Sequence, residues 1–139
     1  MIGGLFWTLI LLACAYALAE GGKDGRWASL LILCASALTI PATRTGWHWV
    51  RMETAVLAVD AGLLAGLYLL ALHSRRYFPI WMAGFELISV STHLATLVAP
   101  HFAPSVYRGV ETVWAIPVVV SMVVGIALDR RPGAATSPP

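Results

Sequence analysis

The chain has 139 residues, of which 59% are hydrophobic and 12% are charged, against about 25% charged residues in ordinary soluble domains. One domain of this length hides only a modest fraction of its surface, so this composition leaves apolar surface that must face lipid. Nine basic and seven acidic residues give a net charge of +2. That charge is too small and too scattered for a nucleic-acid-binding protein, and we expect no nucleic-acid partner.

Five apolar segments follow one another along the chain. A helix that crosses a bilayer needs about 20 mostly apolar residues, within a range of about 17–25. The last three segments meet this length, the first is at its lower limit, and the second is short. We therefore predict an all-α integral membrane helical bundle of one domain, residues 1–128, with five transmembrane helices. Four helices are the alternative, if the second segment does not cross. The expected spans are residues 3–19, 27–42, 52–72, 80–99 and 109–128.

The distribution of Lys and Arg predicts the orientation of these helices. With five spans, six basic residues share one side of the membrane and three share the other. Because cytoplasmic loops carry the excess of Lys and Arg, we expect the N-terminus outside and the tail, residues 129–139, in the cytoplasm. This tail is rich in Pro, Ala and Ser and is predicted to be disordered. The Arg-rich and Ala-rich composition suggests a bacterium, so the expected location is the inner membrane. The six basic residues are Lys23, Arg26, Arg75, Arg76, Arg130 and Arg131, and the three are Arg44, Arg51 and Arg108.

The first segment also allows another interpretation. It ends in an Ala-x-Ala pattern that would permit signal-peptide cleavage between Ala19 and Glu20. A secretory signal begins with a basic region, however, and none of the first 22 residues is Lys or Arg. Cleavage would also place the six basic residues outside, against the positive-inside rule. We therefore expect the mature protein to retain Met1 or Ile2.

The fourth segment carries ionisable residues where little water is expected. Glu86, Ser89 and His93 are spaced three and four residues apart, so they share one face of a helix. On the preceding segment, Asp60 lies about 12 Å from the outer end of its helix, and His93 lies about 10 Å from the outer end of its own. The two segments are joined by a short loop and are expected to be antiparallel neighbours, so Asp60 and His93 should meet. The same count places Tyr68 near the level of Glu86.

These five residues form a candidate intramembrane polar site, which has two main interpretations. An Asp in the middle of a transmembrane helix costs roughly 2.5–3.5 kcal/mol, so a partner is nearly obligatory. In the first interpretation, a hydrogen bond between Asp60 and His93 only holds two helices together. In the second, the site handles protons or ions, since ionisable residues within membranes are functional candidates. A third possibility is that the spans are set wrongly.

Gly62 and Gly66 form a pattern of small residues on the opposite side of the third segment. Such a pattern lets two helices approach closely. We favour packing within the bundle, and the alternative is the interface of a homodimer.

Motifs of known catalytic or cofactor sites do not occur in the sequence. There is no nucleophile elbow, phosphate-binding loop or HExxH motif. A haem needs two histidines at one depth, or one histidine and an open position, and His93 is the only histidine well inside a segment. His48 and His101 fall in outer loops and give a weak signal for a metal. We expect no cofactor and no metal.

Segment 74–95, SRRYFPIWMAGFELISVSTHLA, contains an Arg-aromatic-x-Pro-x-Trp-x-Ala-Gly-Phe run and a later Thr-His pair. In this it resembles a group of short, multi-pass bacterial membrane proteins. The resemblance covers one loop and one helix, and it implies a multi-pass architecture and a membrane location but no activity. The matching residues are Arg76, Tyr77, Pro79, Trp81, Ala83, Gly84, Phe85, Thr92 and His93.

Together these features predict a multi-pass inner-membrane protein of non-enzymatic type, an accessory or interaction subunit of a membrane complex. Its partners would be the lipid bilayer and another membrane protein or a second copy of the chain. The alternative is a small transporter or proton-coupled component, with a polar path through Asp60, Glu86 and His93. A third class, a membrane enzyme that acts on a lipid or a quinone, has no supporting motif.

Overall fold

The computed structural model describes residues 2–44, 49–98 and 104–130, and it is helical almost throughout these ranges. This confirms the all-α class, and the described residues contain no strand. Each predicted apolar segment lies on one helix, except that residue 99 of the fourth lies outside the described residues. The helices are α1 (Ile2–Glu20), α2 (Gly22–Arg44), α3 (Trp49–His73), α4 (Phe78–Val98) and α5 (Pro104–Asp129).

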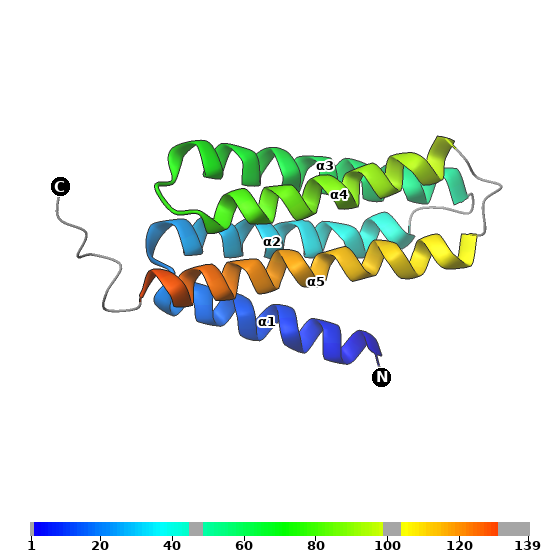
Figure 1. Cartoon of the computed structure of the whole chain (residues 1–139). Helices are drawn as coiled ribbons and strands as arrows, with labels where there is room; N and C mark the ends of the chain where they lie inside the picture. Colours follow the sequence, from blue (N-terminus) through cyan, green and yellow to red (C-terminus); the bar gives the residue numbers. More distant parts are fainter. Residues whose placement is uncertain (1, 45–48, 99–103, 131–139) are drawn as a thin grey trace.

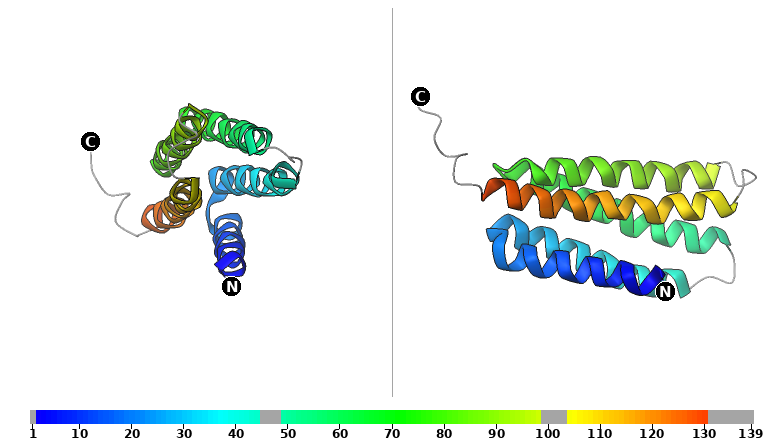
Figure 2. Two further views of the ribbon diagram at one scale, coloured as in Figure 1. Left: turned by 90° about the vertical axis from the view of Figure 1, so that its right-hand side faces the viewer. Right: turned by 60° about the horizontal axis from the view of Figure 1, so that its bottom comes forward.

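The five helices run up and down beside one another (Figure 1). Viewed along the bundle in Figure 2, each helix lies beside its neighbours in the chain, and α5 also lies against α1. Three pieces of chain meet at one end of the bundle: the turn at Gly21, the loop Ser74–Tyr77 and the last turn of α5. We call this the Arg76 end.

Helix α2 begins at Gly22, directly after the turn that follows α1, and so earlier than the span predicted from residue 27. Gly22 has a φ of 63°, a left-handed conformation that glycine adopts without a steric penalty. The helix then includes Lys23 and Arg26, which precede the predicted span at residue 27. The difference arises because hydropathy marks where a helix becomes apolar, whereas charged side chains such as these are good helix formers.

Polar contacts tie the Arg76 end together. Arg76 Nη1 donates a hydrogen bond to the carbonyl oxygen of Gly21 at 2.8 Å, and Arg76 Nε lies 3.6 Å from Asp129 Oδ2. Ser74 Oγ donates to Asp24 Oδ2 at 2.6 Å, so the α3–α4 loop is also joined to the start of α2. The arrangement fixes the relative positions of the helix ends. A further ion pair joins Arg130 to Glu20.

The apolar core lies in the half of the bundle next to the Arg76 end. Next to that end, α4 and α5 approach so closely that a Cβ at Gly125 would lie 2.2 Å from Phe78 Cβ. Only glycine permits this contact. The fully buried apolar side chains are Ile10, Ala13, Cys14, Ala17, Ala28, Ile32, Leu67, Phe78, Met82, Val118, Val119, Met122 and Ile126.

Many large apolar side chains lie on the outer surface of the bundle. Large side chains such as Leu12, Leu72 and Trp81 are more than 60% exposed. By length and composition, two helical stretches of the described residues, Thr54–His73 and Phe78–Val98, are apolar enough to cross a membrane. The apolar stretches Gly4–Glu20 and Val113–Asp129 are shorter. The structure therefore shows five helices, two of which have the length and composition of membrane spans.

Candidate functional site

The candidate site lies between α3 and α4, which the short loop at Ser74–Tyr77 makes antiparallel neighbours. Buried residues recur every three or four positions along α4, as expected for one side of a helix. Toward the Arg76 end this face is apolar, and further along it becomes polar. Its buried residues are Phe78, Pro79, Met82, Glu86, Ser89, His93 and Thr96.

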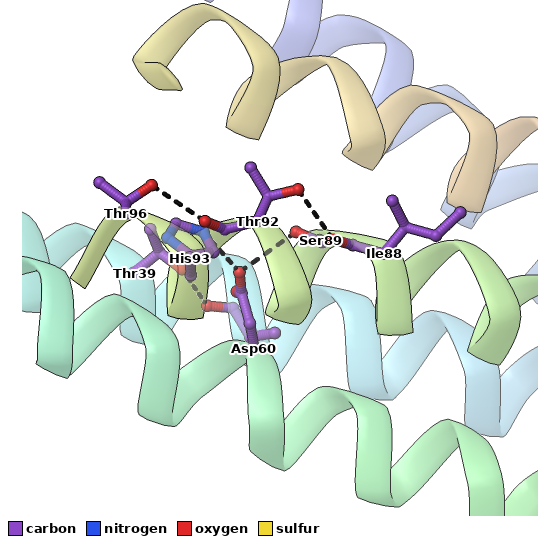
Figure 3. A network of polar contacts seen from close by, with 8 residues as sticks. Thr39, Asp60, Ile88, Ser89, Thr92, His93 and Thr96 are labelled. Carbon is purple, nitrogen blue, oxygen red and sulfur yellow. Dashed lines mark hydrogen bonds and ion pairs between the residues drawn. The ribbon is translucent and has the colours of Figure 1, made fainter. Parts of the chain in front are cut away.

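Asp60 and His93 are in contact, as the depth count predicted. His93 Nε2 lies 3.0 Å from Asp60 Oδ2, a favourable distance for a hydrogen bond between these groups. Ser89 Oγ donates to the same carboxylate oxygen at 3.5 Å, a longer and weaker bond. Figure 3 shows Ser89 and His93 converging from α4 on the single Asp60 side chain of α3. Both side chains are largely buried, with 6% of His93 and 18% of Asp60 exposed.

Glu86 lies on the same buried face, two turns before His93, and is 4% exposed. It interacts electrostatically with Asp60 and with His93. The cluster therefore holds two carboxyl groups and one imidazole, and its charge depends on how many protons they carry.

Several hydroxyl groups near the cluster bond to their own helix. Thr96 Oγ1 donates to the carbonyl oxygen of Thr92 at 2.9 Å, and Ser91 Oγ donates to that of Leu87 at 2.7 Å. Such bonds to the preceding turn satisfy a hydroxyl within an apolar environment. The bond from Ser89 to Asp60 links α4 to α3, whereas these bonds stay within α4.

Tyr68 does not join the other predicted site residues. Its side chain is 58% exposed and lies on the outer surface of α3. The depth count matched its level to Glu86, but Tyr68 is eight residues beyond Asp60, which rotates it by about 80° around the helix. Tyr68 therefore shares the depth of Glu86 but points away from it, to the outside of the bundle.

The two glycines of α3 have different surroundings. A Cβ at Gly66 would lie 2.7 Å from Leu31 Cδ2, so this glycine lets α2 approach α3 closely. A Cβ at Gly62 would have nothing within 4 Å. Packing within the bundle thus accounts for Gly66, while Gly62 lies on the exposed surface.

Trp114 on α5 is a polar residue that the sequence analysis missed. Its Nε1 atom is buried, and no acceptor among the described residues lies within hydrogen-bonding reach. Trp114 precedes Val118 by one turn, on the side of α5 that is buried. Counting depth along the fifth segment, as was done for the third and fourth, would have placed it near the level of Ser89 and His93.

The structure describes no metal site. Among the residues that it covers, no three His, Cys, Asp or Glu side chains are placed to hold a metal ion, Asp60, Glu86 and His93 included. The loop histidines His48 and His101 lie outside the described residues, as does most of the predicted tail. Asp129 itself, where the tail was predicted to begin, belongs to α5.

Comparison with known proteins gives no relative from which a function could be carried over. No family model matches the chain, and no curated protein or solved structure matches it.

Proposed function

We propose that this chain is a multi-pass protein of the bacterial inner membrane, with all five helices in the bilayer. One observation carries the proposal: of the two stretches long and apolar enough to cross a membrane, Thr54–His73 has the higher mean hydropathy, and only 6% of it is buried inside the bundle. A soluble protein would bury such a helix, since exposed apolar surface of this extent is costly in water. In a bilayer the same surface faces acyl chains. The other three helices, α1, α2 and α5, complete the bundle and cross with it.

Extraction of membranes tests this placement. The protein should stay in the membrane fraction at alkaline pH, which releases peripheral proteins, and should dissolve only in detergent. Recovery in the soluble fraction after cell lysis would contradict the proposal.

Within the membrane, we assign the chain a non-enzymatic role as an accessory subunit that contacts another membrane protein or a second copy of itself. The supporting feature is the outer face of α3, where Ala58, Ala61, Gly62 and Ala65 are exposed. Small residues at this spacing let a partner helix approach closely, which is how helices associate in lipid.

A photo-activated cross-linking residue can test this contact at Ala61. Ala95 is the matched control, because it is also an exposed alanine and lies on the neighbouring helix α4. We expect a discrete protein adduct from position 61 and only lipid adducts from position 95. The same adducts from both positions would contradict an interface on α3.

A second candidate function, a proton-coupled component, is favoured by the cluster of Asp60, Glu86 and His93. Three ionisable side chains within interaction range provide sites where a proton can be held and passed on. The test is proton flux into liposomes containing the purified protein. Asp60→Asn should abolish the flux and leave the fold intact, whereas Ser91→Ala should leave the flux unchanged, since Ser91 is exposed and bonds only to its own helix.

A further inference from the structure

The interior of the bundle has an apolar half and a polar half. At about 1.5 Å per residue, every fully buried apolar side chain described lies within about 17 Å of the Arg76 end. Ile10, Ile32 and Val118 are the farthest from it. Among the described side chains, the buried polar groups within this distance are the hydroxyl of Ser29, which donates to the carbonyl oxygen of Cys14 at 3.4 Å, and the carboxyl of Glu86, about 12 Å from the Arg76 end.

From this depth onward the fully buried side chains that the structure describes are polar. They are Ser89, His93 and Thr96, and Asp60 of α3 bonds to two of them. His93 lies about 22 Å along α4 from Phe78. The change from apolar to polar therefore falls near the middle of the bundle, and Glu86 lies about one turn before it, on the side of the Arg76 end.

Other groups at this level also need hydrogen-bond partners. The prolines within α2 and α5, Pro41 and Pro117, each leave the carbonyl four residues earlier without its helical N–H donor. The buried indole N–H of Trp114 finds no acceptor among the described residues. Unpaired polar groups are costly inside a membrane protein unless water or a neighbouring side chain satisfies them. Water is therefore favoured in this half.

Helix α1 covers this half less than the other. Among its described side chains, from Gly4 on, the fully buried ones lie in its second part, from Ile10 onward, whereas Leu5 is 72% exposed. Figure 1 shows α1 diverging from α5 toward its N-terminus. The polar half is thus enclosed mainly by α2, α3, α4 and α5.

We propose that water enters the bundle from the end opposite Arg76 as far as Asp60, Glu86 and His93, and that the apolar half closes it toward the Arg76 end. The cluster then exchanges protons with one side of the membrane only, the outer side. This inference rests on the second candidate function and adds the direction of access. Among the residues of α2 and α5 whose side chains the structure describes, the one other ionisable group at this level is Cys34, which is exposed. The exchange therefore involves these three groups.

Cysteine labelling can measure water along this path, because a thiol reacts as its thiolate, and the thiolate forms where water can solvate its charge. The background variant replaces the native cysteines, Cys14→Ala and Cys34→Ala. Single serines are then changed to cysteine, which adds little volume. A membrane-impermeant thiol reagent is applied to intact cells or to inverted vesicles.

Three serines give a matched set. Ser89 is buried in the polar half and Ser29 in the apolar half. Ser91 is close to Ser89 on α4 but exposed on the outer surface, which faces lipid under the proposed function. We expect Ser89→Cys to be labelled in intact cells at least about tenfold faster than Ser29→Cys or Ser91→Cys. From the opposite side, in inverted vesicles, it should stay unlabelled.

Each other outcome has a definite meaning. Rapid labelling of Ser91→Cys would show that the outer surface of α4 meets water, and would overturn the membrane placement itself. Protection of both Ser89→Cys and Ser91→Cys would leave that placement standing but overturn the water path. Labelling of Ser89→Cys from the inverted side would overturn its direction. Thr96→Cys, nearer the open end, serves as a second probe if Ser89→Cys fails to fold.

Discussion

Replacing Asp60 and His93, singly and together, should reveal an energetic coupling between their side chains. Asp60→Asn keeps the shape of the side chain and removes its charge, and His93→Ala removes the imidazole. The contact between them is a single bond of 3.0 Å between His93 Nε2 and Asp60 Oδ2. Ser89 is the second donor to Asp60, at 3.5 Å.

The size of this coupling follows from two limits. At an effective dielectric constant of about 20, two unit charges separated by 3.0 Å attract by about 5–6 kcal/mol. This is an upper bound, because removing both charges from water costs several kcal/mol. Hydrogen bonds between membrane helices average about 0.6 kcal/mol in double-mutant cycles and reach about 1.7 kcal/mol. Given the short distance and the burial, we expect a coupling of about 0.6–1.7 kcal/mol.

The assay is reversible unfolding in mild detergent, with the free energy of unfolding measured for the wild type, both single variants and the double variant. The double variant should lose less stability than the sum of the single losses. In a control cycle, Ser91→Ala replaces His93→Ala, and its effect should add to that of Asp60→Asn. Additivity within about 0.5 kcal/mol for Asp60 and His93 would refute the contact.

Two further pairs of variants test the packing of the helices and of their ends. Gly125→Ala should lose about 1–3 kcal/mol of stability, because its Cβ would lie 2.2 Å from Phe78 Cβ. Gly62→Ala should lose no stability, because nothing lies within 4 Å of its added Cβ. Equal shifts in melting temperature for Gly125→Ala and Gly62→Ala would contradict this packing. Arg76→Lys should lower the free energy of unfolding by about 0.5–1.5 kcal/mol, because it removes the 2.8 Å hydrogen bond from Arg76 to Gly21 in the α1–α2 turn. Arg75→Lys alters an exposed side chain and should be neutral; matching losses would show that the turn does not depend on Arg76.

The sequence predicted the polar face well because a helix has a fixed period. The spacing of Glu86, Ser89 and His93 determines that they share one side, and their poor fit to lipid determines that this side faces inward. The contact with Asp60 followed from its depth, from the short loop that makes α3 and α4 antiparallel, and from the need of an Asp in an apolar helix for a partner. Both inferences need only the geometry of single helices and one loop.

Other features depend on how several helices are rotated and packed. Tyr68 had the right depth but the wrong direction, which the rotation of α3 decides. Gly62 and Gly66 form one pattern in the sequence, yet α2 packs against only one of them. The bond from Arg76 to Gly21 joins residues 55 positions apart, and no local pattern indicates it.

Reporter insertions in the loops test the five-span membrane bundle most directly, because each insertion reads which side of the membrane its loop occupies. Five spans predict a cytoplasmic reporter after Gly22, after Arg75 and after Pro139, and an external reporter at position 46. If only Thr54–His73 and Phe78–Val98 crossed, positions 46 and 139 would lie on the same side. If α2 did not cross, positions 22 and 46 would lie on the same side. Either result would contradict the five-span bundle.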